Sequence, residues 1–376
     1  MGDHSEIVAG GTPNTGHPEY WNPKEIPWMS SGEINNKVIY STDNMISKIG
    51  FSNSSAKWVK EKSVLIALAG QGKTRGTVAI SEIPLTTNQS IAAIQPDSFL
   101  YYKFLFQNLE ERYNELREVS SGDGTRGGLN KQIISDLEVL APEIQEQIKI
   151  GDFLCGIDTL ITLHQRKYDK LTKVKKAMLE KMFPENGSPY PEIRFKGFTD
   201  AWEQRKLGDT VQITMGQSPD GSTYSDVPSD YILVQGNADL QNGWVSPRVW
   251  TSQMTKKADA GDLIMSVRAP AGAMGKTAYN AVIGRGVAAI KGNEFIYQLL
   301  EKMDSDGYWK ALSCGSTFES LNSDNIKNAD VLIPDVAEQE KIGEYFLAID
   351  RLITLHQRKL EKLKNIKKAC LEKMFV

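Results

Sequence analysis

The eight residues Leu160-Ile-Thr-Leu-His-Gln-Arg-Lys167 return unchanged as Leu352–Lys359, and this repeat organises the whole chain. It is part of a longer one: residues 139–183 return at residues 331–375, and 28 of the 45 aligned positions are identical. The sequences ahead of the two copies resemble each other far less. The chain is therefore a pair of variable modules, each followed by a nearly constant segment. Variable parts usually choose a target, whereas constant parts usually serve one scaffold or partner.

The constant segment has the pattern of a long helix. Gln145–Met182 and Ala337–Met374 contain no proline, and apolar or semi-apolar residues recur in both at spacings of four and three. These seam positions are Ile157, Ile161, His164, Tyr168, Leu171, Met178 and Met182 in the first copy, and Ile349, Ile353, His356, Leu360, Leu363, Cys370 and Met374 in the second. Such a heptad seam predicts a helix of ~38 residues, about 57 Å long, that buries its apolar face against another helix. Lys175 and Lys367 interrupt the seam at equivalent positions.

Two equal helices in one chain can bury their seams against each other. An antiparallel pair would relate the two copies by a pseudo-two-fold axis and put the modules at opposite ends, whereas a parallel pair would put them side by side. The sequence alone does not choose between these arrangements. The antiparallel coiled coil explains the helix length better, because it separates the modules, and it is the arrangement we expect.

The modules have the pattern of mixed α and β structure. Short runs rich in β-branched residues, bounded by glycine-rich turns, predict strands at Ser63–Leu68, Thr77–Ile80, Ser90–Ile94, Leu263–Val267 and Val287–Ile290. Helical patches follow at Phe99–Glu118 and Asn293–Ser313. The expected fold class is α+β, with two globular α/β domains joined by the two long repeated helices.

The openings of the modules also align, at Met1-Gly-Asp3 and Leu207-Gly-Asp209. A lead-in, Tyr190–Trp202, precedes the second opening and has no counterpart before Met1, so the first module is either truncated or does without it. Pro184–Pro191 predicts a linker. The expected divisions are a first module at residues 1–144, a first spacer helix at 145–183, linker and lead-in at 184–206, a second module at 207–336 and a second spacer helix at 337–376.

Composition bounds the class of protein without naming its partner. The chain has 376 residues, 40% of them hydrophobic, and a formal net charge of −3. This net charge neither indicates nor excludes binding to nucleic acid, because local basic surfaces matter more than the total charge. Its three cysteines are scattered and show no zinc-ligand spacing, which suits a reducing cytoplasm. There is no signal peptide and no apolar run long enough for a membrane span, so we expect a cytoplasmic protein without a metal site.

Several segments together resemble one family. Both repeats end in Leu-Glu-Lys-Met-Phe, the first module contains Gly10-Gly-Thr-Pro13, and the lead-in reads Glu192-Ile-Arg-Phe-Lys-Gly-Phe198, followed by Trp202-Glu-Gln-Arg-Lys-Leu-Gly208. Two variable domains, two repeated helices and these motifs, in this order, resemble the specificity subunit of type I restriction–modification systems over essentially the whole chain. The departure from the pattern is the lead-in, which is not found before Met1.

The resemblance implies a division of labour. Each module would be a target-recognition domain that reads one half of a bipartite site in double-stranded DNA. The helix pair would set the gap between the half-sites and dock two adenine methyltransferase subunits, to which restriction subunits are added. S-adenosylmethionine, and the ATP and Mg needed for restriction, would bind to the partner subunits, with no cofactor in this chain.

The residues agree with a non-catalytic chain. An adenine N6-methyltransferase needs an Asp/Asn-Pro-Pro-aromatic motif to hold the flipped base, and this chain has no Pro-Pro. Gly-Lys-Thr occurs at residues 72–74 and 275–277, but Ala67 and Pro270 stand where a phosphate-binding loop needs its first glycine. We expect both to be tight turns that present a lysine, either to DNA or to solvent. The lysine-rich halves Lys167–Lys181 and Lys359–Lys373 are either a solvated face or a docking surface.

Base edges are read by Arg, Lys, Asn and Gln, and glycine- and asparagine-rich loops carry these side chains in both modules. The predicted DNA-binding residues are Lys73, Arg75, Arg126 and Lys131 in the first module and Asn237, Gln241, Arg268, Lys276 and Arg285 in the second. Two other functions stay open. One is a stand-alone sequence-specific DNA-binding regulator, and the other is a coiled-coil interaction scaffold that does not bind DNA.

Overall fold

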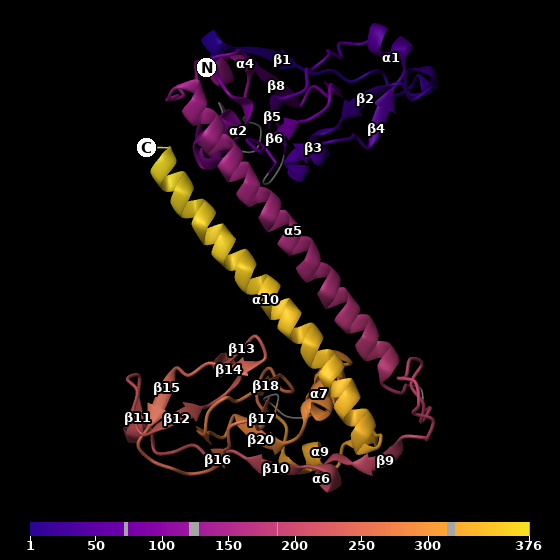
Figure 1. The fold of residues 1–376 in the computed structure, drawn as a ribbon, viewed down its shortest axis with the longest axis vertical. Helices are drawn as coiled ribbons and strands as arrows, with labels where there is room; N and C mark the ends of the chain where they lie inside the picture. The colour runs from indigo at the N-terminus through magenta and orange to yellow at the C-terminus, as the bar shows by residue number, and fades with distance from the viewer. Residues whose placement is uncertain (71–73, 120–127, 186, 314–319, 376) are drawn as a thin grey trace. The chain divides into compact units, whose positions relative to one another are not determined.

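The computed structural model describes the chain except for residues 71–73, 120–127, 186, 314–319 and 376. It divides into two compact units (Figure 1). Unit 1 comprises Met1–His164 and Lys359–Val376, and unit 2 comprises Gln165–Arg358. Each unit therefore holds one variable module together with one half of each repeated helix.

The repeated segments form helices α5 (Ile144–Met182) and α10 (Val336–Met374), each beginning one residue before the predicted start. In unit 1, Leu154 near the beginning of α5 packs in one cluster with Leu371 near the end of α10. In unit 2, Lys175 near the end of α5 contacts Asp350 in the first half of α10, at 2.7 Å. The helices are therefore antiparallel, which confirms the expected arrangement and excludes the parallel one.

The seam is buried in part. Ile157, Ile349 and Leu360 are 7% exposed or less, and most other seam residues are half-buried. Met374 is the exception at 39% exposed, whereas its counterpart Met182 is 4% exposed.

The module of unit 1 is built around a five-stranded sheet in the order β1-β8-β5-β6-β3. The bounds are β1 (Ser5–Ala9), β8 (Ile91–Pro96), β5 (Ser63–Ala67), β6 (Val78–Ser81) and β3 (Val38–Ile39). A smaller sheet contains β4 (Asn44–Ile46), β2 (Ile26–Met29) and β7 (Thr86–Thr87), and the helices are α1 (Lys48–Ser52), α2 (Tyr102–Glu111), α3 (Tyr113–Glu118) and α4 (Lys131–Asp136). All five residues of β5 are buried, because Val64 and Ile66 pack on the side of α2 while Leu65 and Ala67 enter a second apolar cluster.

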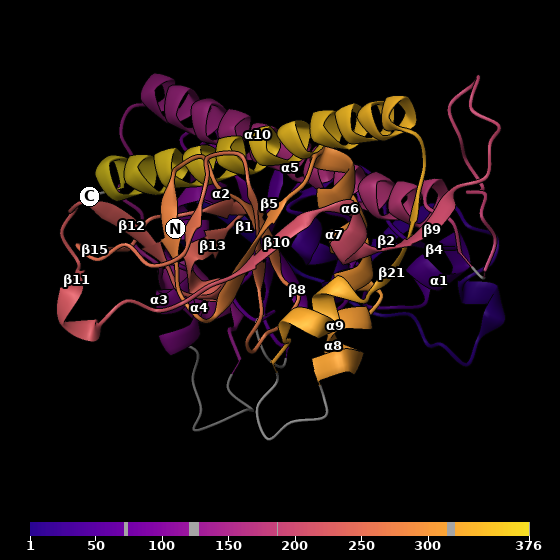
Figure 2. The ribbon, with the colours of Figure 1, turned by 90° about the horizontal axis from the view of Figure 1, so that it is seen from below.

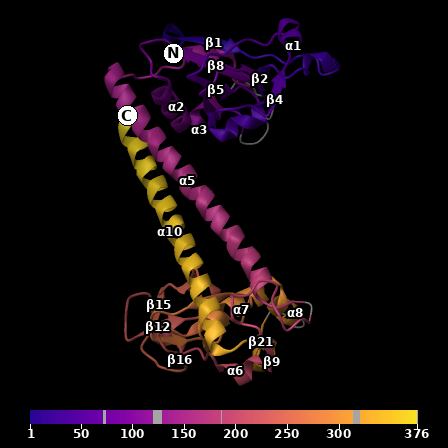
Figure 3. The ribbon, with the colours of Figure 1, turned by 45° about the vertical axis from the view of Figure 1, so that its right-hand side comes forward.

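The module of unit 2 is larger. A six-stranded sheet has the order β10 (Gln212–Met215), β20 (Val287–Lys291), β17 (Leu263–Ser266), β18 (Met274–Lys276), β14 (Trp244–Val245) and β13 (Leu240–Gln241). A five-stranded sheet has the order β11 (Tyr224–Ser225), β15 (Val249–Thr251), β12 (Tyr231–Val234), β19 (Ala281–Ile283) and β16 (Lys257–Ala258). The helices are α6 (Leu207–Thr210), α7 (Glu294–Ser305), α8 (Tyr308–Ser313) and α9 (Ser323–Lys327). Figure 3 shows α7 beside the first half of α10.

The two modules share one plan despite their different sequences. The strand order β1-β8-β5-β6 in unit 1 corresponds to β10-β20-β17-β18 in unit 2, and α2 corresponds to α7. The predicted strands and helical patches are confirmed. In unit 2, besides the longer sheets, the end of the lead-in continues into β9 (Glu203–Lys206), which pairs with β21 (Asp330–Ile333) next to α6 (Figure 2). Within the described residues, no helix is both long and apolar enough to cross a membrane.

Candidate nucleic-acid interface

In unit 2, the strand ends of β10, β12, β17 and β19 meet at one end of the module, which we call the loop end. Three backbone hydrogen bonds tie these strand ends and the loops after them to one another: Gln217 N to Ile283 O (2.8 Å), Gly284 N to Val234 O (2.8 Å) and Val267 N to Gly286 O (2.9 Å). A fourth, from Leu321 N to Val267 O (2.9 Å), adds the segment before α9. Loops after strand ends are exposed, variable and often functional.

Unit 1 has the same loop end. Its equivalent hydrogen bonds join Gly11 N to Thr87 O (2.8 Å), Asn88 N to Met29 O (3.0 Å), Leu68 N to Ser90 O (2.8 Å) and Leu129 N to Leu68 O (2.9 Å). Each bond falls at the position that its counterpart holds in unit 2. One backbone frame thus carries two different sets of side chains, which is what two readers of different targets require.

A glycine at the start of each loop end keeps this frame compact. A Cβ on Gly10 would lie 2.3 Å from the carbonyl oxygen of Asn88, and one on Gly216 would lie 2.1 Å from that of Gly284. No side chain fits at such distances, so the two chain segments can approach only at glycine. This explains why a glycine stands at the same place in both modules.

The structure brings three predicted residues of unit 2 together. Arg268 and Arg285 are exposed and lie on adjoining loops, since Val267 N bonds to Gly286 O. Asn237 is half-buried and lies two residues after Gln235. The backbone of Gln235 lies close to Gly286, the residue after Arg285, since a Cβ on Gly286 would be 2.0 Å from the Gln235 carbonyl oxygen. An asparagine and two arginines at one loop end are suited to base edges and phosphates.

The sequence did not reveal a fourth polar residue, Arg248. Its Nε and Nη2 donate to Oδ1 of the buried Asp239, at 2.9 and 2.7 Å, while 48% of its side chain is exposed. Asp239 ends the 3-10 turn that begins at Asn237. The hairpin of β13 and β14 separates Asp239 from Arg248 in the sequence, so no short sequence motif indicates this pair.

Two predicted residues of unit 2 lie elsewhere. Gln241 is exposed on β13, next to the turn residue Asn242, whose Oδ1 accepts from Gln357 Nε2 of α10 at 3.2 Å. Lys276 was predicted to lie in a tight turn. This prediction was wrong, because Lys276 is the last residue of strand β18. It is 9% exposed, and both carboxylate oxygens of Glu294 accept from its ammonium at 2.8–2.9 Å. An ammonium neutralised within the module is not available to DNA, and we withdraw Lys276.

In unit 1, Lys73 and Arg126 lie outside the described residues. Arg75 is half-buried, between β5 and β6. Lys131 is exposed at the first position of α4, directly after Asn130, whose side chain accepts from Ile133 N and caps that helix.

Gln89 is the exposed counterpart of Arg285 at the unit 1 loop end, and its amide contacts the hydroxyl of Thr12. Neither Gln89 nor Thr12 had been predicted from the sequence. Aligning the loop ends of the two modules would have identified both.

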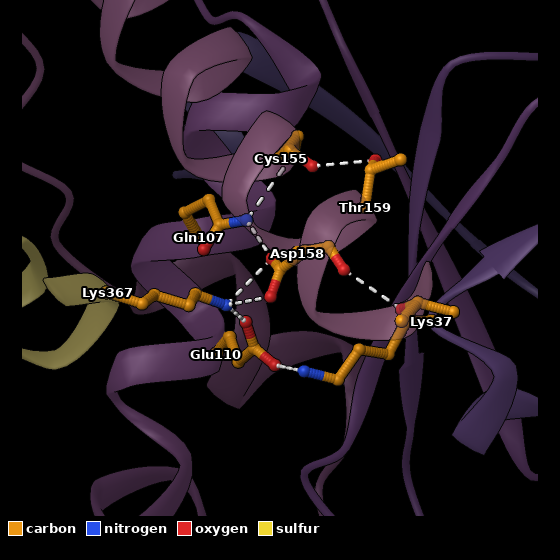
Figure 4. A network of polar contacts seen from close by, with 8 residues as sticks. Lys37, Gln107, Glu110, Cys155, Asp158, Thr159 and Lys367 are labelled. Carbon is orange, nitrogen blue, oxygen red and sulfur yellow. Dashed lines mark hydrogen bonds and ion pairs between the residues drawn. The ribbon is translucent and has the colours of Figure 1, made fainter. Parts of the chain in front are cut away.

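A buried polar cluster joins the unit 1 module to both helices (Figure 4). Lys367 of α10 is 7% exposed, and its Nζ donates to both carboxylate oxygens of Asp158 on α5 at 2.7 Å and to Glu110 of α2 at 2.6 Å. Gln107 Nε2 donates to Asp158 at 2.7 Å, and Lys37 pairs with Glu110. Burial works against the charged form of Lys367, but Glu110 and Asp158 outweigh it and raise the pKa of Lys367. We call this cluster the anchor.

Unit 2 repeats the anchor at equivalent positions. Lys175 of α5 contacts Glu301 of α7 and Asp350 of α10, both at 2.7 Å, and Gln298 Nε2 donates to Asp350 at 2.8 Å. The lysine comes from α10 in unit 1 and from α5 in unit 2, as expected for a pseudo-two-fold pair. This arrangement explains why a lysine interrupts each seam.

The repeated block contributes one more feature. Leu160 and Leu163 on α5 and their counterparts Leu352 and Leu355 on α10 are each 45% exposed. The two leucine pairs lie in identical sequences and are equally exposed, so each unit presents the same apolar leucine surface. Among the described residues, no group of three or more His, Cys, Asp or Glu side chains is placed to hold a metal ion.

Comparison with known proteins places this geometry in a family. The family model described as the type I restriction modification DNA specificity domain matches residues 1–173 and 199–365. A putative type I restriction enzyme MjaX specificity subunit from Methanocaldococcus jannaschii is 26% identical over 279 residues, which cover 71% of this chain and 65% of the relative. The MjaIX specificity subunit of the same organism is 26% identical over 99% of this chain and 90% of its own length.

A solved structure shares the fold. The crystal structure of a type I restriction-modification system S subunit from M. genitalium covers 100% of this chain and 94% of its own length. The TM-score is 0.69 at 13% sequence identity.

Proposed function

The chain belongs to the family of type I restriction modification DNA specificity domains, and on that premise we propose how its parts divide the work. It is the DNA specificity subunit of a type I restriction–modification system. Each module is a target-recognition domain that reads one half of a bipartite site. The observation that carries this assignment is the loop end, where one backbone frame recurs in both units with different side chains.

In unit 2, we assign base contacts to Arg268, Arg285 and Asn237, with Arg248 at their edge. Arginine pairs with the O6 and N7 atoms of guanine and asparagine with adenine, both in the major groove. The support is that the four residues lie at one loop end, where Arg248, Arg268 and Arg285 are exposed and Asn237 is half-buried. Gln241 lies away from these four residues, and we propose that it contacts only the phosphate backbone of the DNA.

In unit 1, Lys131 and Gln89 are exposed at the loop end and are the assigned contacts. Lys73, Arg75 and Arg126 stay predictions from the sequence. The net charge of −3 is compatible with this role, because partner subunits can supply much of the phosphate neutralisation.

The helix pair acts as the spacer between the half-sites. Because α5 and α10 each contribute to both units, the length of the pair would fix the number of unread base pairs. Removing one heptad from both helices is expected to shorten that gap and leave both half-sites unchanged.

Two methyltransferase subunits are the proposed partners on the helices, joined in the cell by restriction subunits. The support is the pair of equivalent leucine surfaces, Leu160 with Leu163 and Leu352 with Leu355, one in each unit. The chain itself is non-catalytic, since it has no Pro-Pro motif to hold a flipped adenine. S-adenosylmethionine, ATP and Mg would bind to the partners, and the complex would act in the cytoplasm.

The test is to co-express the chain with a family-matched methyltransferase subunit and to map N6-methyladenine across the host genome. Methylation at one bipartite motif that disappears when this chain is omitted is the expected result. Replacing Arg268 and Arg285 with alanine should relax only one half-site. A chain that binds a bipartite operator without partners would instead be a stand-alone regulator, and a chain that forms complexes with no DNA dependence would be a scaffold.

A further inference from the structure

One guanidinium at the loop end of unit 2 is held by a buried carboxylate. Nε and Nη2 of Arg248 both donate to Oδ1 of Asp239, at 2.9 and 2.7 Å. Asp239 is 2% exposed, and its other oxygen, Oδ2, accepts from the backbone amides of Gln235 (2.7 Å) and Gly236 (3.2 Å). The backbone therefore fixes the carboxylate, and the carboxylate in turn fixes one edge of the guanidinium.

This pair stands on the backbone frame of the loop end. Arg248 directly precedes β15, which pairs with β12, the strand that leads into Gln235. The carbonyl oxygen of Gln235 would lie 2.0 Å from a Cβ on Gly286, the residue after Arg285. The strand end and the turn that hold Arg248 thus belong to the same frame that carries Arg285.

The outer edge of the Arg248 guanidinium is open. An arginine carries five N–H donors in a flat fork, and Asp239 takes the donor of Nε and one of Nη2. No acceptor among the described residues takes the donors that remain on Nη1 and Nη2, and 48% of the side chain is exposed. Two parallel N–H groups on one edge match the O6 and N7 acceptors of guanine in the major groove.

The ion pair also decides between a base and a phosphate as the partner of Arg248. Contacts to phosphate gain most of their energy from positive charge that releases counterions. The carboxylate of Asp239 offsets the charge of Arg248, which weakens its attraction to phosphate but leaves its N–H groups as directional donors. Arg268 and Arg285 differ, since both are exposed and no carboxylate among the described residues forms an ion pair with them.

Unit 1 keeps the buried carboxylate and uses it differently. Glu33, 6% exposed, is the third residue of the 3-10 turn after β2, as Asp239 is the third residue of the turn after β12. Its Oε2 accepts from the backbone amide of Asp43 at 2.8 Å, and Asp43 precedes β4 as Arg248 precedes β15. The exposed residue on this common frame is therefore an acid in one module and an arginine in the other, as expected for a position that reads a base.

We propose that Arg248 reads one guanine in the half-site of unit 2 through its Nη1–Nη2 edge, and that Asp239 is the positioning residue for this contact and touches no DNA. The inference rests on the proposed function, because it needs the loop end to face DNA. Since the carboxylate holds the side chain in advance, little side-chain freedom is lost on binding, and the discrimination depends on Asp239 as well as on Arg248.

The test uses the full chain in complex with the methyltransferase subunit and synthetic duplexes that carry the mapped methylation motif. Each guanine of the motif is replaced in turn by 7-deazaguanine, which lacks the N7 acceptor, or by hypoxanthine, which keeps both O6 and N7. At one guanine, 7-deazaguanine should weaken binding about tenfold or more, whereas hypoxanthine should not. In Arg248→Ala and Arg248→Lys, the natural duplex should bind more weakly by a similar factor, and 7-deazaguanine at that guanine should cause no further loss.

Asp239→Asn should reduce discrimination at the same guanine, because an amide in place of the carboxylate no longer holds the guanidinium. The matched control is Arg205→Ala in the same unit. Arg205 lies on β9, and its Nε and Nη2 donate to one oxygen of Glu203 at 3.0 and 2.5 Å, so it has the same kind of pair away from the loop end. This variant should leave the affinity for every duplex unchanged. Thermal unfolding of each variant shows whether it is folded, and the Arg248 variants decide the test if Asp239→Asn is not.

Three results would overturn the proposal. One is a 7-deazaguanine effect that keeps its full size at every guanine in the Arg248 variants. Another is an equal loss of affinity for all sequences with a salt slope reduced by about one, which would make Arg248 a phosphate contact. The third is full base discrimination in a folded Asp239→Asn chain. In each of these cases the complex still methylates one bipartite motif and the proposed function stands, whereas a complex that methylates no such motif would refute the proposed function and this inference together.

Discussion

Replacing Lys367 with methionine should destabilise unit 1 more than any exposed substitution on the same helix. Methionine keeps the length of the side chain but removes the ammonium that lies 2.6–2.7 Å from Glu110 and Asp158. Breaking a buried ion pair by removing one partner costs about 3–5 kcal/mol, because a carboxylate is left buried without its counter-charge. Gln107 still bonds to Asp158 and Lys37 still pairs with Glu110, which places the expected loss at about 3 kcal/mol, the lower end of that range.

Differential scanning calorimetry measures this loss. A unit of this size changes its melting temperature by about 2–4 °C per kcal/mol, so the expected decrease is about 6–12 °C. Hydrogen exchange of the α2 amides would assign the decrease to unit 1. The matched control is Lys364→Met, an exposed lysine three residues earlier on α10, which should change the melting temperature by less than about 2 °C. Equal effects of the two substitutions would refute the anchor as a stabilising cluster.

The pH dependence provides an independent check of the same prediction. Burial opposes the charge on Glu110, but Lys367 and Lys37 outweigh it and lower its pKa below 4.5, so its contribution is present above pH 4.5 and is lost as the pH falls through the folded value. The pKa of Lys367 is raised above 10.5, so its contribution is present below pH 10.5 and is lost as the pH rises through the folded value. The difference between wild type and Lys367→Met should therefore be constant from about pH 5 to pH 10 and shrink toward pH 3.

Three further predictions follow from the other surfaces. Lys175→Met should lower the melting temperature of unit 2 by a similar amount, and α7 amides rather than α2 amides should lose protection. Leu163→Glu together with Leu355→Glu should abolish co-purification of a methyltransferase subunit without changing thermal unfolding, because both leucines are 45% exposed; retained co-purification would assign docking elsewhere. Arg285→Ala should weaken binding to the cognate site by about 1–3 kcal/mol in a salt-controlled titration, whereas Lys276→Met should lower stability instead, since Lys276 pairs with Glu294 inside the module. A larger loss of base discrimination from Lys276→Met than from Arg285→Ala would reverse our assignment of the two residues.

The sequence was sufficient to predict the repeated helices and the core strands. The heptad spacing and the absence of proline extend over many turns, so the helix signal accumulates along the segment. Strands such as β5 and β17 are buried on both faces and therefore appear as continuous apolar runs. The direction of the helix pair was not determined by this pattern, because an apolar seam fits either orientation. Lys175 and Lys367 hold that information, since each lysine meets its aspartate only in the antiparallel register.

The functional surface was less predictable. Lys276 and Arg285 are both basic residues near glycines, yet one is neutralised by Glu294 and the other is exposed. The difference depends on a partner that lies on another element, since Lys276 is on β18 and Glu294 on α7, and residue type and local spacing do not reveal that contact. Arg248 was missed for the same reason, because Asp239 positions it across a hairpin.

The anchor explains how variable modules can be combined with constant helices. Phe104-Leu-Phe-Gln-Asn-Leu-Glu110 and Phe295-Ile-Tyr-Gln-Leu-Leu-Glu301 are the parts of α2 and α7 that meet the spacer. Gly151 and Gly343 on the spacer allow this approach, since a Cβ on them would lie 2.7 Å from Phe104 N and 3.2 Å from Phe295 N. The phenylalanine, the glutamine and the glutamate each contact residues of the spacer helices that are the same in both repeats. A module that keeps these three residues meets the same lysine and aspartate whatever loops it carries, so its target can change while the helix pair and its docking surfaces do not.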